Sequence, residues 1–320
     1  MSTRRCFLIL LLFVVSGCIH IDLFPGGGAL KETILSGEGD EKVLLIDISG
    51  MLTTAKSSGI VDEPSLPARI KEELTKAEKD DHVKAIVLRI NTPGGSVTAS
   101  DLVYHELKAF KKKRTLPVIA AIMDLGTSGG YYIAMAADHV VAHPSTITGS
   151  VGVIMVTMNA QGLLEKVGVQ PTAIVSGPMK AMGSPFRPMN EEEQAIFQGA
   201  IDHLYEQFLA VIEEGRPGLS KEHIRRLADG RIFTADIAKA QGLVDDIGYL
   251  EEALDLAKKE AKLEHATVVT YIRGGGTHHN IYSQFDPPQI GPIGFPQVDA
   301  HSLFNVLTGG TPQMLYMWMP

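Results

Sequence analysis

From residue 43 onward, short and fully apolar runs alternate with stretches that have helical spacing. Continuous apolar runs of this length predict strands buried on both faces, and such strands belong to parallel sheets covered by helices. We therefore expect an α/β fold with parallel sheets and flanking helices. The predicted strands are 43–48, 85–90, 118–123, 139–142, 153–158 and 172–175. The predicted helices are 67–79, 100–113, 131–137, 191–214, 221–228, 234–241 and 250–263.

The composition supports a folded protein of this class and excludes several others. Of the 320 residues, 45% are hydrophobic and 21% are charged, which is unlike a disordered or collagen-like chain. The formal net charge of −8 argues against a nucleic-acid partner, because a nucleic-acid surface needs positive charge to displace counterions. Both cysteines, Cys6 and Cys18, precede the predicted core, so neither a disulfide framework nor a cysteine zinc site is expected within it. No cofactor is implied.

The N-terminus has the layout of a signal peptide. Arg4 and Arg5 precede an apolar run over 7–15, which is about half the roughly 20 residues that a membrane-spanning helix needs. The sequence Val-Ser-Gly-Cys that ends at Cys18 resembles the lipobox of bacterial lipoproteins. We therefore expect residues 1–17 to be removed and Cys18 to be lipidated. The folded part would then be anchored at a membrane of the bacterial cell envelope, outside the cytoplasm. An ordinary secretory signal that happens to contain a cysteine is the alternative.

Three divisions follow the signal peptide. Residues 18–42 are polar and Gly-rich with no hydrophobic period, and they are predicted to be a flexible tether. Residues 43–272 contain all the predicted strands and helices and form the folded domain. Residues 273–320 are rich in glycine and proline, so no packed element is expected there. The adjacent His278 and His279 cannot by themselves close a metal site, and no metal is predicted.

A glycine-rich turn, Asn-Thr-Pro-Gly-Gly-Ser at 91–96, follows the predicted strand 85–90. Glycines such as Gly94 and Gly95 have no Cβ, so they can adopt unusual dihedral angles and let a substrate carbonyl approach the backbone N–H groups. The turn is therefore a candidate oxyanion site. An ordinary tight turn is the alternative.

A second glycine-rich turn places Ser128 at the start of the predicted helix 131–137. The N-terminus of a helix favours developing negative charge, and the neighbouring glycines keep the hydroxyl accessible, as in a nucleophile elbow. The spacing is not Gly-x-Ser-x-Gly, so the elbow of the α/β-hydrolases is absent. A simple N-cap is the alternative role for this serine.

Two further segments contain candidate polar groups. Ser150 lies in the turn Thr-Gly-Ser-Val-Gly at 148–152. Lys180 is flanked by Met, Ala, Gly and Pro, and no carboxylate occurs between Glu165 and Glu191. Burial in an apolar pocket would lower the pKa of this lysine and make its neutral amine available as a base. An exposed loop lysine is the alternative.

Four motifs in a fixed order resemble the signal peptide peptidase A (SppA) family, the S49 serine peptidases, within the Clp protease and crotonase superfamily. The resemblance extends over about residues 43–260 and implies a ClpP/crotonase-like spiral of ββα units. The motifs are Asn-Thr-Pro-Gly-Gly-Ser-Val at 91–97, Thr-Ser-Gly-Gly-Tyr-Tyr at 127–132, Pro-Ser-Thr-Ile-Thr-Gly-Ser-Val-Gly at 144–152, and Ser-Gly-Pro-Met-Lys at 176–180 with Ser-Pro-Phe at 184–186.

The same resemblance implies a role for each candidate. Ser128 would be the nucleophile and Lys180 the general base and then acid of a Ser/Lys dyad. The backbone N–H groups of Gly95 and Gly129 would form the oxyanion hole. Ser150 matches a family serine that hydrogen-bonds the lysine, so it is a candidate positioning residue.

The resemblance also implies an assembly and a substrate class. In single-domain members of the family the lysine approaches the serine of an adjacent protomer. This chain has one copy of each motif, so a homo-oligomer is expected. The expected reaction is endopeptidase cleavage of hydrophobic, membrane-derived peptides such as released signal peptides, with small or apolar residues beside the scissile bond.

Three other interpretations stay open on the sequence alone. A Ser/His/Asp peptidase could use Asp138, His139 or His143. A non-catalytic lipoprotein scaffold could keep the fold without the activity. A crotonase-type acyl-CoA enzyme would share the oxyanion geometry, but it would need neither the serine nucleophile nor Lys180.

Overall fold

The structure is a computed structural model that describes residues 29–55, 64–273, 280–282 and 314–319. The predicted signal peptide, Cys18, His278 and His279 lie outside the described residues. Within the described part of the chain, no helix combines the length and the apolar character needed to cross a membrane. The same residues contain no cluster of three or more His, Cys, Asp or Glu side chains that could hold a metal ion.

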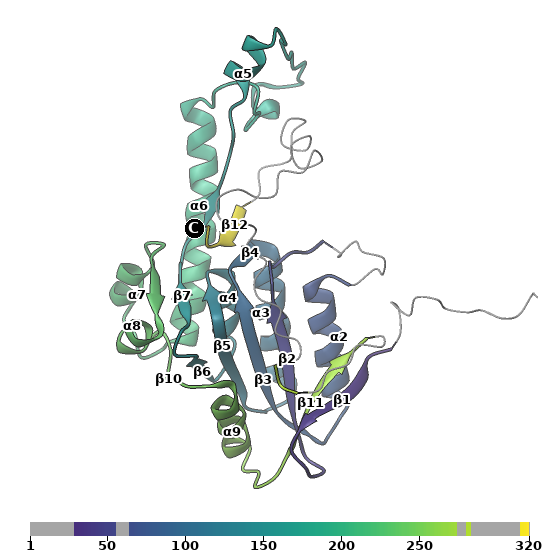
Figure 1. Cartoon of the computed structure of the whole chain (residues 1–320). Coiled ribbons are helices and arrows are strands. Elements are labelled where there is room, and N and C mark those ends of the chain that lie inside the picture. The colour runs from purple at the N-terminus through teal and green to yellow at the C-terminus, as the bar shows by residue number, and fades with distance from the viewer. Residues whose placement is uncertain (1–28, 56–63, 274–279, 283–313, 320) are drawn as a thin grey trace, which may run out of the picture.

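A mostly parallel sheet forms the centre of the fold (Figure 1). Its main path, in spatial order, is β1 (Lys31–Ser36), β11 (Thr267–Ile272), β2 (Lys42–Ser49), β3 (Val83–Thr92), β5 (Val118–Thr127), β6 (His139–Ala142) and β10 (Asp246–Ile247). All neighbouring pairs on this path are parallel except β1 with β11. Two short strands, β7 (Ile147–Gly149) and β9 (Ile232–Thr234), extend the sheet beside the end of β5.

Helices cover both faces of this sheet. Strand side chains alternate between two cores: Leu44 and Ile46 of β2 belong to the larger core, whereas Val43 and Leu45 belong to the smaller one. The larger core is closed by α2 (Leu66–Glu78), α3 (Val97–Lys113), α4 (Gly129–Ala134) and the C-terminal half of α6 (Glu191–Gly215). The smaller core is closed by α9 (Leu250–Glu260). The short helices α7 (Lys221–Leu227) and α8 (Ala235–Ala240) flank β9. Because both faces are buried, the prediction of an α/β fold with flanking helices is confirmed.

An arm projects from this body. We define the arm as residues 154–193, which contain β8 (Ile154–Met155), α5 (Gln161–Lys166), the 3-10 helix η1 (Pro178–Ala181) and the start of α6. Figure 1 shows α5 beyond the upper end of α6, away from the sheet. Large apolar side chains are exposed on the arm: Val156, Met158, Leu163, Val167, Val169, Ile174 and Val175. The part of the chain that the structure describes therefore leaves this apolar surface uncovered.

The structure corrects three predictions about elements. Residues 31–36, assigned to the tether, form the edge strand β1. Its polar side chains interrupt the apolar run by which a buried strand is predicted. Residues 172–175 are not a strand but an exposed part of the arm, where Ile174 is 98% exposed. The predicted strand 153–158 shortens to β8.

The C-terminal segment also differs from the prediction. Ile281 is buried in the smaller core, and its carbonyl oxygen accepts a hydrogen bond from the buried guanidinium of Arg89. Residues Met314–Met317 form the strand β12, which lies between β4 (Gly94–Ser96) and β8 in a second, three-stranded sheet. Parts of the segment 273–320 are therefore packed elements of the fold.

Candidate active site

Ser128 is held in a strained conformation between β5 and α4. Its φ is 52° and its ψ is −112°, a combination that non-glycine residues rarely adopt. The backbone keeps it there, because the Ser128 N–H donates to the Gly149 carbonyl 2.7 Å away. The side chain is 1% exposed, and its hydroxyl has no hydrogen-bond partner among the described residues. It makes no capping bond to α4, so the interpretation as a simple N-cap is wrong. Strain combined with an unpaired buried hydroxyl is typical of a functional site.

The first glycine turn contains the short strand β4 (Gly94–Ser96), which pairs with Leu52 through the backbone. The Leu52 N–H donates to the Gly94 carbonyl at 2.9 Å, and the Ser96 N–H donates to the Leu52 carbonyl at 2.8 Å. Gly94 has a φ of +98°, which a side chain would strain. A Cβ on Gly95 would overlap the Leu52 carbonyl oxygen and come within 2.7 Å of the Leu52 nitrogen. Both positions therefore require glycine.

The two glycine turns lie against each other. The position that a Cβ of Gly94 would take is 2.8 Å from the backbone nitrogen of Gly129. The structure thus brings together Ser128, the turn with Gly95, and Gly129, as the sequence predicted. The importance of Leu52 could not be found from the sequence, because nothing local marks a residue whose backbone only supports a distant turn.

Ser150 adjoins this group through the backbone. It follows Gly149, whose carbonyl holds Ser128, and it also has a positive φ of 49°. Its N–H donates to the Arg231 carbonyl at 2.7 Å. Ser150 lines a small cavity of about 200 Å³ together with Gly152, Val153, Ile154, Gly230 and the last described residues Met317, Trp318 and Met319.

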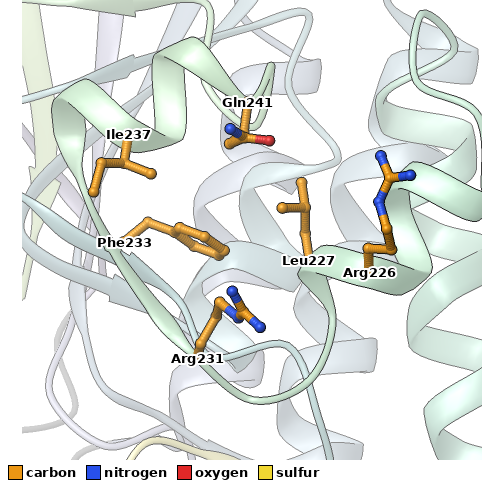
Figure 2. A pocket seen from close by; sticks show the side chains of 6 residues that line it. All are labelled: Arg226, Leu227, Arg231, Phe233, Ile237 and Gln241. Carbon is orange, nitrogen blue, oxygen red and sulfur yellow. The ribbon is translucent and has the colours of Figure 1, made fainter.

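A separate hollow of about 420 Å³ lies between α7, β9 and α8 (Figure 2). The side chains that line it are Arg226, Leu227, Arg231, Phe233, Ile237 and Gln241, and none of the predicted site residues is among them. Phe233 connects the two regions, because the space where Gly149 would carry a Cβ is filled by the Phe233 ring. Phe233 therefore packs against the turn that carries Ser150, and the hollow itself lies outside the predicted site.

Lys180 is not brought to Ser128 within one chain. It lies on η1, which is tied to the start of α6 because Arg187 binds both the Ala181 carbonyl and the Glu193 carboxylate. Phe208, further along α6, contacts the ring of Tyr132 beside the site. Glu193 marks the end of α6 near Lys180, and Phe208 marks the part of α6 near the site. At 1.5 Å per helical residue these two positions are about 22 Å apart, which exceeds the reach of a lysine side chain.

The surroundings of Lys180 also differ from the expectation. Its side chain is exposed, and its amine has no hydrogen bond or ion pair with another described residue. The described residues of a single chain therefore do not form the apolar pocket expected around this amine.

The candidates for a Ser/His/Asp triad have other partners. His143 Nδ1 lies 2.8 Å from the Ser145 hydroxyl, His139 Nε2 lies 2.9 Å from Asp246, and Asp138 accepts from Lys111 at 2.6 Å. None of them contacts the Ser128 hydroxyl, which has no partner in the described chain.

Replacement of His143 by alanine tests the triad directly. We expect His143→Ala to change kcat/KM for a peptide substrate by less than about threefold, because the ring contacts only Ser145 and Tyr249 near the surface. Steady-state hydrolysis measures this, with Ser128→Ala as the inactive reference. A loss of a hundredfold or more would favour the triad.

Comparisons with known proteins place the chain among the peptidases. The model of peptidase family S49 matches residues 110–264, and the Clp protease model matches residues 55–148. A protein of Enterococcus faecium named "Putative signal peptide peptidase SppA" is 37% identical over 251 residues, which cover 78% of this chain and 72% of that protein. Protease 4 of Haemophilus influenzae is 33% identical over 71% of this chain and 36% of its own length. Among solved structures, a mutant of the 1510-N membrane-bound stomatin-specific protease aligns with a TM-score of 0.44 and 17% identity, covering 68% of this chain and 85% of that chain.

The mostly parallel sheet, together with the two family models and the sequence relatives, defines a serine peptidase with a Clp-like α/β fold. The chain belongs to peptidase family S49.

Proposed function

We propose that the chain is a membrane-associated endopeptidase that hydrolyses released signal peptides and other hydrophobic peptides with a Ser/Lys dyad. The observation that carries this proposal is the Ser128 hydroxyl, which is buried, has no partner among the residues that the structure describes, and is held in a strained turn beside the two glycine turns. The name of the Enterococcus relative supports the substrate class.

In the proposed reaction, the neutral amine of Lys180 takes the Ser128 proton as the oxygen attacks the scissile carbonyl. The N–H groups of Gly95 and Gly129 stabilise the oxyanion of the tetrahedral intermediate. The lysine then protonates the leaving amine, and water hydrolyses the acyl-enzyme by the same steps. The Ser150 hydroxyl would orient the lysine, which makes it a positioning residue.

We propose that each site combines Ser128 of one copy with Lys180 of another. Three features support this. Lys180 lies on η1, which is tied to the start of α6, and the length of α6 separates it from Ser128 of its own chain. The arm that carries Lys180 exposes apolar side chains, which a second copy could cover. The cavity beside Ser150 offers space where a lysine from outside could enter.

The location of the enzyme is part of the proposal. A lipid on Cys18 would hold the peptidase at an envelope membrane, outside the cytoplasm, where signal-peptide remnants are released from the bilayer. Mass spectrometry of the mature N-terminus tests this assignment, because a diacylglyceryl cysteine adds a defined mass to the first peptide.

Mixing two inactive variants tests the shared dyad. Ser128→Ala and Lys180→Ala are each expected to be inactive, but their co-assembly in equal amounts should restore about one quarter of the sites, because a neighbour pair then contains both groups by chance. The two variants are co-expressed with different tags, purified through both tags, and assayed with a fluorogenic apolar peptide.

The control pairs Ser128→Ala with a double variant that lacks both Ser128 and Lys180, which must stay inactive. Failure of the first pair to recover activity, in particles that contain both tags, would contradict a site shared between copies. An inactive wild-type protein would contradict the proposed function itself.

A further inference from the structure

Thr92 lies between the two glycine turns of the candidate site. It is the last residue of β3, and its backbone pairs with Gly126 of the neighbouring strand β5. Its side chain is 0% exposed, so its polar and apolar groups are both enclosed by protein. A threonine side chain combines a methyl group with a hydroxyl that can donate one hydrogen bond and accept others. The contacts of these two groups reach both halves of the candidate site.

The hydroxyl of Thr92 fixes the peptide that precedes Gly94. The Gly94 N–H donates to Thr92 Oγ1 at 3.1 Å, so a side chain holds the backbone two residues further on. The Thr92 hydroxyl in turn donates to the carbonyl of Gly50, which follows β2. A hydroxyl can make both bonds at once, because it has one hydrogen and two lone pairs. The first glycine turn is therefore tied to the end of β2 through this side chain.

The peptide that follows Gly94 is fixed from its other side. It contains the Gly94 carbonyl, which accepts from the Leu52 N–H at 2.9 Å, and the Gly95 N–H, which is the proposed oxyanion donor. The carbonyl and the N–H of one trans peptide lie in one plane and point in opposite directions, and the described residues contain no cis peptide bond. The bond from Leu52 therefore sets the direction of the Gly95 N–H. The bond to Thr92 holds the preceding peptide, which keeps the φ of Gly94 at +98°.

The methyl group of Thr92 packs against the other glycine turn. A Cβ on Gly130 would lie 2.7 Å from Thr92 Cγ2 and 3.2 Å from the Thr92 carbonyl oxygen. Gly130 is the second residue of α4, which begins directly after Ser128. One buried side chain thus contacts the helix that follows the proposed nucleophile and also holds the turn that contains the proposed oxyanion donor.

We propose that Thr92 is a positioning residue that aligns the oxyanion turn with the Ser128 hydroxyl. The proposal rests on the proposed peptidase function. An oxyanion donor is effective when it is already directed at the place where the charge develops, so a small rotation of its peptide reduces the stabilisation of the transition state. Such an interaction is stronger in the transition state than in the bound substrate. A less constrained turn should therefore lower kcat and leave KM nearly unchanged.

Isosteric replacement of the hydroxyl tests this role. Thr92→Val keeps the shape of the side chain but takes this partner away from the Gly94 N–H and the Gly50 carbonyl. We expect kcat for an apolar peptide to fall about 10- to 100-fold, which is less than for loss of a whole oxyanion donor, with KM changed by less than about twofold. Thr92→Ser keeps the hydroxyl, so its kcat should stay within about threefold of the wild type. Thermal unfolding gives the folded fraction of each variant at the assay temperature, and kcat is normalised to that fraction.

A transition-state analogue gives a second readout, which a loss of stability alone would not change. A peptide aldehyde binds through an adduct with the Ser128 oxygen, and the former aldehyde oxygen then occupies the oxyanion site. Its inhibition constant should rise in Thr92→Val by about the same factor as kcat/KM falls. The peptide alcohol of the same sequence forms no such adduct, so it should bind equally well to the wild type and to the variant.

Thr267→Val is the matched control for the loss of a buried hydroxyl. Thr267 is 7% exposed, and its hydroxyl donates to the Gly39 carbonyl at 2.7 Å. It pairs with Lys42 at the start of β2, whereas Thr92 is bonded to the turn after the end of that strand. The control should lose stability to a similar extent and keep the wild-type kcat and aldehyde affinity.

Thr92→Ser and Thr92→Ala give the same comparison if Thr92→Val does not fold. Both variants lack the methyl group and differ only in the hydroxyl. We expect kcat to be about tenfold or more lower in Thr92→Ala than in Thr92→Ser, because only the serine can still hold the Gly94 N–H.

Separate outcomes overturn the two proposals. A folded Thr92→Val variant with the wild-type kcat would show that the hydroxyl does not align the turn, and so would equal losses of kcat in Thr92→Ser and Thr92→Ala. A fall in kcat for Thr92→Val without a loss of aldehyde affinity would place the effect outside the oxyanion site and overturn the positioning role. Absence of hydrolysis and of fluorophosphonate labelling in the wild type would instead overturn the proposed function.

Discussion

Replacement of Ser128 by alanine is expected to lower kcat/KM for an apolar peptide by at least about 10⁴-fold, because the proposed acyl-enzyme forms on this hydroxyl. The fold should survive the change. The hydroxyl is buried without a partner among the described residues, so its removal leaves no other group unsatisfied. The unfolding temperature should therefore stay the same or rise, because the change removes a buried hydroxyl that has no partner there while alanine keeps the same backbone.

Hydrolysis rates, labelling by a fluorophosphonate probe and thermal unfolding together check this result. Ser145→Ala is a matched control, because Ser145 is exposed and its hydroxyl contacts only His143. The control should label and hydrolyse like the wild type. A wild-type rate no higher than that of Ser128→Ala would favour the interpretation as a non-catalytic scaffold.

Replacement of Gly95 by alanine is expected to cause the second large loss, of about 10²- to 10³-fold in kcat. The added methyl group would overlap the Leu52 carbonyl oxygen, so the turn must move and its N–H would no longer point at the substrate carbonyl. Because the neighbouring atoms are backbone, the cost in stability should also be about 1–3 kcal/mol.

Gly218→Ala is the matched control for this change. A Cβ at that position meets nothing within 4 Å, and Gly218 does not have a positive φ. Steady-state kinetics and thermal unfolding of the two variants separate the effect on the oxyanion site from the general effect of a glycine replacement. Full activity in a folded Gly95→Ala variant would show that this N–H does not stabilise the oxyanion.

The central sheet was predictable because its pattern is local. Strands such as β2, β3 and β5 are buried on both faces, so each contains a continuous apolar run that stands out in the sequence. β1 has the opposite character. It is an exposed edge strand that is stable only through its pairing with β11, more than two hundred residues away, and a pairing of that kind leaves no local pattern.

The candidate site was predictable only in part. The order of the motifs correctly predicted that Ser128 begins a helix beside a glycine turn. The strain at Ser128 was not visible, because it depends on the carbonyl of Gly149, which reaches the serine through the pairing of β5 with β7. The burial expected for Lys180 was also absent, because the flanking residues lie on an arm rather than in the body.

The sequence by itself determined the class of fold and the family, since periodicity and motif order are properties of neighbouring residues. It also supplied Ser128 and Lys180 as the candidates for a Ser/Lys dyad. Only the tertiary structure decided that Lys180 lies apart from Ser128 and that Tyr316 lies beside Gly95 and Gly129. Both depend on where distant segments meet in space. These contacts depend on the pairing of strands that are distant in sequence and on the direction of the long helix α6. Neither can be predicted from the residues that flank Lys180 or Tyr316.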